Sequence, residues 1–201
     1  EAYYNLSFQN FSDLLNPVHS NTHKYQQGNV LILAGSSGMS GSALMASKAS
    51  SLSGVGMLHI LTTEKVYQDL FPILPHVLYH TGEESAQWIA HIEHIAPKLD
   101  ALLIGPGLGL TEMTTEVLAH VLALDIPIVV DADAITMLTR TPSLQQSLRK
   151  REAPTLFTPH EGEAKRMADV YRHEKLWPTW TRLEKIRSLA QDYQSYILLK
   201  G

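Results

Sequence analysis

Short apolar runs alternate along the chain with longer stretches in which apolar residues recur every three or four positions. The short runs lie at Val30–Ala34, Met57–Leu61, Val77–Tyr79, Ala101–Ile104, Ile128–Val130, Thr155–Phe157 and Tyr196–Leu199. The longer stretches between most of them are Ser42–Ser53, Glu64–Phe71, Glu83–Pro97, Thr111–Leu124, Glu161–Tyr171 and Thr179–Tyr193. The short runs predict buried strands and the longer stretches predict amphipathic helices. Their alternation predicts an α/β fold with a mainly parallel sheet, covered by helices on both faces.

The stretch Asp100–Leu110, DALLIGPGLGL, joins a predicted strand to a predicted helix near the middle of the chain. Open α/β sheets bind ligands just beyond the carboxyl ends of their strands, where such turns lie. Glycines let a ligand approach the backbone closely, and the amino-terminus of a helix favours an anion. A ligand-binding loop and a tight connection without a ligand fit these residues equally well.

A second glycine-rich turn follows the first apolar run, in the sequence LILAGSSGMSGS from Leu31 to Ser42. It lacks the Lys-Ser/Thr of a phosphate-binding P-loop and the spacing of a GxGxxG dinucleotide motif. A loop of such small residues can nevertheless admit a flat or bulky ligand. The helix that follows is also rich in small residues, and we favour core packing alone as its role.

Acidic and histidine side chains follow two later predicted strands. Asp131 and Asp133 come directly after Ile128–Val130. They could flank a site or hold Mg²⁺ through water, or one of them could cap a helix. His160 follows Thr155–Phe157 with two glutamates close behind, where it could donate to a ligand or transfer a proton.

Two histidine pairs, His76 with His80 and His91 with His94, have spacings that occur among metal ligands. The sequence places no third ligand beside either pair. An exposed polar surface explains them more simply, and we expect no metal site there.

The composition narrows the class of protein. The 201 residues are 44% hydrophobic, which suits one α/β domain or two small ones. The net charge of −4 gives no indication of a nucleic-acid or membrane partner. Cysteine is absent, which excludes disulfides and thiolate sites, and no secretory signal pattern opens the sequence. We therefore expect a cytoplasmic protein.

Six segments occur together in the order typical of one known family: His23-Lys24 with Gly28, then LILAGSSGMSGSA, IGPGLG, PIVVDADAI, TLFTPHEGE and ILLKG. In these segments the chain resembles the ADP/ATP-dependent NAD(P)H-hydrate dehydratases of the ribokinase-like superfamily. The resemblance covers residues 23–201 and implies a three-layer α/β/α sandwich. Residues 1–22 are then an amino-terminal arm or an interdomain linker, and an epimerase domain could precede them, as in bifunctional repair enzymes.

The resemblance implies a lyase that repairs hydrated nicotinamide cofactors. Such an enzyme removes water from the S epimer of hydrated NADH or NADPH, using ADP or ATP as co-substrate together with Mg²⁺. The implied chemistry is kinase-like, with phosphorylation of the ring hydroxyl followed by loss of phosphate. The family often assembles symmetrically, so a homo-oligomer is expected.

The resemblance also assigns residues. Ser42, Gly107 and His160 match positions that contact the hydrated nicotinamide, and Lys200 and Gly201 open the adenine-nucleotide segment. Asp131 and Asp133 are expected to play a supporting or Mg²⁺-linked role.

This chain departs from the family pattern at Ser42, where alanine is usual, and at Tyr25, where glycine is frequent. The family's later Gly-Thr-Gly-Asp segment, with the expected catalytic base, would lie beyond Gly201. We therefore expect an incomplete domain with no catalytic residue in this chain, unable to complete the reaction alone.

Two other functions remain open. The first is a ribokinase-like kinase of a small alcohol, such as a sugar or hydroxymethylpyrimidine, which would share the fold and the nucleotide site. The second is a truncated nucleotide-binding module without activity. The combination of GPGLG, DADA and TPHEGE favours the dehydratase.

Overall fold

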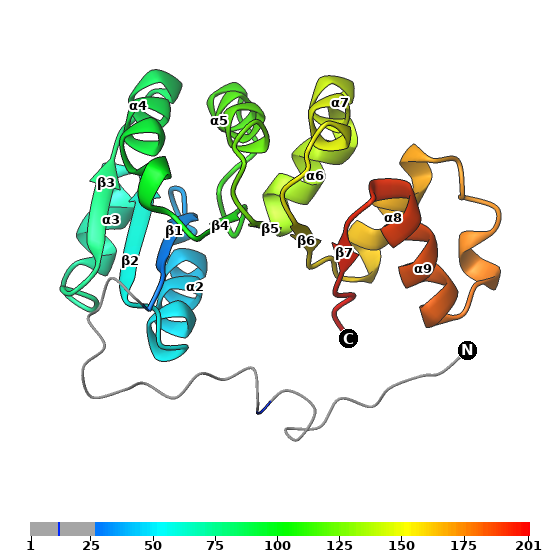
Figure 1. The fold of residues 1–201 in the computed structure, drawn as a ribbon, viewed down its shortest axis with the longest axis horizontal. Coiled ribbons are helices and arrows are strands. Elements are labelled where there is room, and N and C mark those ends of the chain that lie inside the picture. Colours follow the sequence, from blue (N-terminus) through cyan, green and yellow to red (C-terminus); the bar gives the residue numbers. More distant parts are fainter. Residues whose placement is uncertain (1–11, 13–26) are drawn as a thin grey trace.

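The computed structural model describes residue 12 and residues 27–201. Apart from residue 12, the predicted arm at 1–22 lies outside the described residues, as does the His23-Lys24 segment. Seven strands form one parallel sheet in the order β3-β2-β1-β4-β5-β6-β7 (Figure 1). The strands are β1 Asn29–Leu33, β2 Met57–Thr62, β3 Leu78–Thr81, β4 Ala101–Ile104, β5 Ile128–Val130, β6 Thr155–Phe157 and β7 Tyr196–Ile197.

The strand order reverses its direction between β1 and β4. From β1 the chain first adds β2 and β3 on one side, and it then returns to add β4 to β7 on the other side. The loops after β1 and β4 therefore diverge at a topological switch point, which is where open α/β sheets bind ligands.

Helices connect the strands. They are α2 Ser40–Leu52, α3 Glu64–Leu70, α4 Ser85–Ile95, α5 Glu112–Leu122, α6 Ala132–Arg140, α7 Pro142–Arg149, α8 Glu161–Val170 and α9 Arg182–Tyr193, with 3-10 turns at Ala96–Lys98 and Trp177–Thr179. Figure 1 shows α4, α5 and α7 on one side of the sheet, α2 and α3 on the other, and α8 and α9 near the β7 end. The sequence pattern located every strand and most helices, but α6 and α7 were missing from the predicted helices.

Two apolar cores lie against the sheet. One, around Ile32, Ile60 and Val66, fills the space between the sheet and helices α2 and α3. The larger one joins the opposite face to helices α4 to α9 and includes Trp88 and Phe157. The predicted parallel sheet is thus confirmed, with helices on both of its faces.

The face of the sheet that α2 and α3 cover is left partly open across β4 to β7. Leu103, Val129, Leu156 and Tyr196 are in register with one another, so their side chains form one row on the same face. The first three are only partly buried, and Tyr196 is 68% exposed. Within the described residues this face is therefore only partly covered over β4 to β7, while helices pack on both faces of the sheet elsewhere.

None of the helices within the described residues is long and apolar enough to cross a membrane.

Candidate functional site

The two loops at the switch point are held together by hydrogen bonds. The Gly35 N–H donates to the Pro106 carbonyl at 2.9 Å, and the Ser36 hydroxyl donates to the Gly107 carbonyl at 2.9 Å. The Gly105 N–H donates to the Leu33 carbonyl at 3.1 Å. The glycine-rich turns that the sequence showed far apart therefore form one unit at the carboxyl edge of the sheet.

Gly107 must be a glycine for steric reasons. Its φ is +60°, and a Cβ atom there would come within 2.9 Å of the Cβ atoms of Met39 and Ser42. The absence of a side chain brings the β4 loop against the first turn of α2. The resemblance assigned Ser42 and Gly107 to one substrate, and they are direct neighbours.

These loops enclose a hollow of about 430 Å³, which we call the switch-point hollow. Its lining residues are Met39, Ser42, Met45, Ala46, Leu103, Pro106, Gly107, Asp131, Ala132 and Asp133. Four of the predicted site residues are thus brought together. The apolar lining residues Met39, Met45 and Pro106 were not predicted, and their position in loops and on an exposed helix face carries no signal in the sequence.

Helix α2 does more than pack against the core. Only Ala43 and Ser47 are buried among its described residues, whereas Met45 is 70% exposed and Ser42 lines the hollow. The expectation of core packing alone for this helix is wrong, because its small residues also form one wall of the hollow.

The helices that begin at this edge of the sheet differ in their capping. Thr63 caps α3, Thr111 caps α5 and His160 caps α8 through side-chain acceptors. The residues preceding α2 and α6, Met39 and Asp131, make no side-chain cap bond within the described structure. Helices α2 and α6 thus present uncapped first turns to the hollow, and such turns favour an anion.

Asp131 and Asp133 have different partners. The Lys200 ammonium lies 2.7 Å from Asp131 Oδ1, and the Gly109 N–H donates to Asp133 Oδ2 at 2.9 Å. Asp131 stands at the amino-terminus of α6, as the capping alternative predicted, but its carboxylate contacts Lys200 and makes no cap bond.

His160 lies one loop further along the same edge and does not line the hollow. Its Nδ1 accepts the Gly162 N–H at 3.0 Å, so the ring proton is on Nε2, which lies 3.2 Å from Glu163 Oε1. The Lys200 N–H donates to the Pro159 carbonyl at 2.8 Å, which connects this loop to Asp131 through the Lys200 side chain. His160 and Gly201 are both exposed.

Comparison with known proteins places this geometry in a family. The family model described as NAD(P)H-hydrate dehydratase matches residues 30–201. The chain belongs to the NAD(P)H-hydrate dehydratase family. It is 36% identical over 180 residues to the ADP-dependent (S)-NAD(P)H-hydrate dehydratase of Bacillus subtilis, covering 90% of this chain and 60% of that protein. It is 32% identical over 196 residues to the bifunctional NAD(P)H-hydrate repair enzyme Nnr of Vibrio cholerae, covering 94% of this chain and 35% of that protein.

Solved structures confirm the ribokinase-like α/β fold. The ADP/ATP-dependent NAD(P)H-hydrate dehydratase of Bacillus subtilis, co-crystallized with ATP/Mg²⁺, superposes with a TM-score of 0.70 at 33% identity. That match covers 93% of this chain and 62% of the solved one. A ribokinase-like superfamily protein from Enterococcus faecalis gives a TM-score of 0.78 at 23% identity, covering all of this chain and 69% of that one.

The family's Mg²⁺ has no fitting set of protein ligands in the described part of this chain. A supporting or Mg²⁺-linked role was expected for Asp131 and Asp133, and in the structure their carboxylates accept from Lys200 and Gly109. Among residue 12 and residues 27–201, no group of three histidine, aspartate or glutamate side chains could hold a metal ion. We therefore assign no protein-held Mg²⁺ here.

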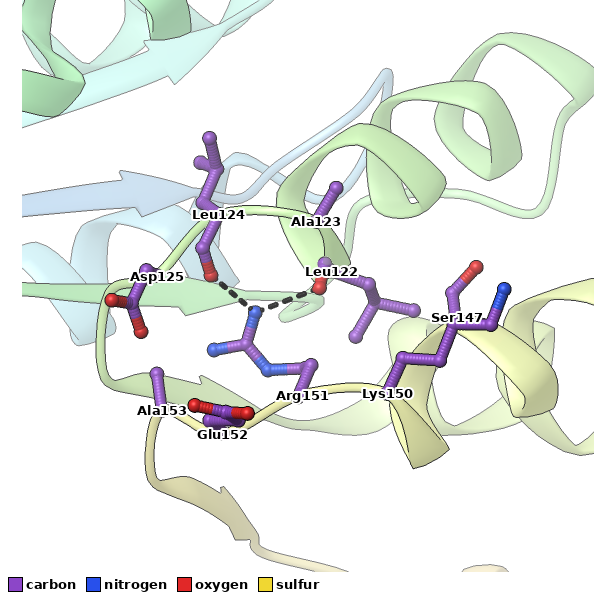
Figure 2. Close-up of a pocket in the computed structure, with 9 residues that line it drawn as sticks. All are labelled: Leu122, Ala123, Leu124, Asp125, Ser147, Lys150, Arg151, Glu152 and Ala153. Carbon is purple, nitrogen blue, oxygen red and sulfur yellow. Dashed lines mark hydrogen bonds between the residues drawn. The ribbon is translucent and has the colours of Figure 1, made fainter.

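A further cavity of about 370 Å³ lies at the opposite edge of the sheet, before β5 and β6 (Figure 2). Asp125, Lys150 and Glu152 lie at its wall, and the Arg151 guanidinium points between the Leu122 and Leu124 carbonyls. Its position at the amino ends of the strands separates it from the switch-point hollow. Arg151 binds carbonyls at the end of α5, which indicates a structural role.

The expected exposed surface holds for His76 and His94, which are exposed, but not for His80 and His91, which are partly buried. His80 is half-buried, its Nε2 lies 3.0 Å from Nδ1 of the buried His59, and its ring lies 5.2 Å from that of His91. Burial, together with nearby His59, His91 and His94, lowers the pKa of His80 from 6.5 to about 4. Burial and Lys98 also lower the pKa of His59, which the sequence analysis missed because it lies within an apolar strand.

We expect stability to fall as the pH decreases from 6.5 toward about 4. In this window the unfolded chain protonates His80 and the folded chain does not, so the unfolded state binds more protons. Thermal melts across the window check this. The His80→Gln variant should lose less stability on acidification, whereas His76→Gln, outside the cluster, should behave like the parent chain. An equal loss in all three chains would contradict the assignment to this cluster.

Proposed function

We propose that this chain provides the site for dehydration of the S epimer of hydrated NADH or NADPH, with ADP or ATP as co-substrate. One observation carries the proposal: Ser42 and Gly107 line a single hollow that also receives the uncapped first turns of α2 and α6. Family membership, established over residues 30–201, supports the same reaction. The chain spans 60% of the Bacillus subtilis relative, so the whole reaction is stated for the family's site and not for these residues alone.

The geometry suits a phosphoryl-transfer route. The terminal phosphoryl group of the nucleotide would pass to the ring hydroxyl, and the C–O bond would then break to release phosphate while a ring proton is lost. Such chemistry needs positioning and charge stabilisation more than covalent help from the protein. The backbone N–H groups at the start of α2 and α6 would stabilise the negative charge that develops on the transferred group.

The remaining assigned residues lie further along the same edge of the sheet and do not line the hollow. His160 would donate from Nε2 to the substrate in place of its contact with Glu163 Oε1, 3.2 Å away, because its Nδ1 is already an acceptor for the Gly162 N–H. Lys200 and Gly201 would contribute to the nucleotide site at the same edge. In the relative's solved structure the nucleotide was supplied as ATP/Mg²⁺, which supports the same pairing here.

The test follows NADH absorbance during incubation of the chain with hydrated NADH, Mg²⁺ and ADP or ATP, and measures binding of hydrated NADH separately by calorimetry. Recovery of absorbance supports the proposal in full. Binding of hydrated NADH without turnover supports the substrate site and indicates that the catalytic groups are not among these residues. Neither binding nor turnover would overturn the proposal, and small alcohols would then be tested as kinase substrates.

Substitutions of His160 separate its two roles. His160→Ala should weaken binding of hydrated NADH about 10-fold or more, as expected for loss of a polar contact worth roughly 1.4 kcal/mol. It should also destabilise α8 by about 1 kcal/mol, because the cap is lost. His160→Asn should weaken binding equally but keep the cap, so its melting temperature should stay near that of the parent chain. Unchanged binding in both variants would exclude His160 from the substrate site.

A further inference from the structure

The Asp131-Ala132-Asp133 turn has an unusual backbone. Asp131 is extended, with φ −132° and ψ 160°, whereas Ala132 has a φ of +48°, in the left-handed region. A left-handed conformation is unfavourable for alanine and persists only when surrounding contacts impose it. The left-handed residue Ala132 separates Asp131 from Asp133, and the two carboxylates extend toward different neighbours.

Asp133 is bound to the loop after β4. Its Oδ2 accepts the Gly109 N–H at 2.9 Å, while the hydroxyl of the buried Thr114 donates to the Gly109 carbonyl at 3.0 Å. The Gly109 residue is thus held on both sides, by α6 through Asp133 and by α5 through Thr114. Gly109 lies two residues after Gly107, which forms the wall of the hollow.

Asp131 is bound to the loop after β7. Its Oδ1 lies 2.7 Å from the Lys200 ammonium, and the Lys200 backbone is in turn bonded to Pro159, next to His160. The two carboxylates therefore connect the three loops that carry the proposed substrate and nucleotide residues.

We propose that Asp131 and Asp133 are positioning residues that set the shape of the switch-point hollow, and that they do not form a divalent-cation site. Their contribution to catalysis rests on the proposed function, but their contacts do not. Asp133 positions the glycine loop and Asp131 positions Lys200. The strained Ala132 lets the two carboxylates reach separate loops.

Amide hydrogen exchange at Gly109, in the ligand-free chain, tests the role of Asp133. Asp133→Ala removes the acceptor and should speed exchange at least 10-fold, whereas Asp133→Asn keeps an oxygen acceptor and should change exchange less than 3-fold, as expected for loss or retention of one hydrogen bond. Asp125→Asn, at the opposite edge of the sheet, is the matched control. Exchange that is equally fast in the parent chain and in Asp133→Ala would overturn the proposal.

Manganese binding tests the alternative. Mn²⁺ titration is followed by electron paramagnetic resonance. Any Mn²⁺ binding by the parent chain should persist in Asp131→Asn, in Asp133→Asn or in both. Binding that disappears in both variants would establish a cation site and overturn the proposal.

Hydrated NADH should bind Asp133→Ala at least 10-fold more weakly than Asp133→Asn, as expected for loss of one positioning contact. If the parent chain does not bind hydrated NADH, the proposed function fails while the exchange result still decides the positioning role.

Discussion

Replacing Gly105 by alanine is expected to destabilise the fold by about 4 kcal/mol, near the upper end of single-substitution effects. A Cβ atom at this position would lie 1.9 Å from the Asp131 carbonyl oxygen and 2.8 Å from the Ala134 Cβ. The φ of Gly105 is +126°, a region that side chains other than glycine rarely adopt. Because the clash is with backbone at the start of α6, the neighbours cannot relieve it by rotating a side chain.

Thermal denaturation checks this prediction, with an expected fall in melting temperature of roughly 8–16 °C for a chain of this length. Gly38→Ala is the matched control. Gly38 also has a positive φ, +80°, but a Cβ atom there meets nothing within 4 Å. It should therefore cost only the backbone strain, about 1 kcal/mol. Equal losses in the two variants would show that the contact with Asp131 does not matter.

The pattern of apolar residues predicted most of the fold because buried parallel strands leave a strong signal. Ala101–Ile104, Ile128–Val130 and Thr155–Phe157 are found as strands with the bounds that the sequence indicated. The third strand is shifted to Leu78–Thr81, since Val77 is buried in the turn before it. The last strand is formally shorter, Tyr196–Ile197, although Leu198 still donates to the Phe157 carbonyl at 2.8 Å.

The sequence analysis missed two helices because a proline separates them. Helices α6 and α7 meet at Thr141, where Pro142 opens α7 and ends any continuous helical pattern across the segment. The proline divides the segment into two short helices of nine and eight residues.

Four lining residues of the switch-point hollow could be predicted to lie close together, but their connections could not. Ser42, Gly107, Asp131 and Asp133 all follow predicted strands, and carboxyl ends of parallel strands meet at one edge. Which neighbour each carboxylate contacts depends on the positive φ of Ala132, which an alanine in the sequence does not indicate. The pairing of His59 with His80 depends on the register between β2 and β3, which was equally hidden.

Replacing Arg151 by alanine is expected to destabilise the protein by about 3 kcal/mol, because several buried acceptors lose a charged donor together. Its Nη1 donates to the Leu122 and Leu124 carbonyls at 2.9 and 2.7 Å (Figure 2). Its Nη2 donates to the Ile126 carbonyl at 2.7 Å. Its Nε donates to the Thr155 hydroxyl at 3.1 Å. One guanidinium thus joins the end of α5 to the starts of β5 and β6.

The adjoining cavity limits the loss, since water can enter it and bind some of the freed carbonyls, which places the effect below that of Gly105→Ala. Arg151→Lys should recover only part of the stability, because a single ammonium group cannot reproduce the planar fork of the guanidinium. Chemical denaturation of both variants measures the difference, with Lys150→Ala, on an exposed neighbour, as the control expected to change stability by less than about 0.5 kcal/mol. Full recovery by lysine would show that the positive charge alone, and not the set of carbonyl contacts, holds this edge of the sheet together.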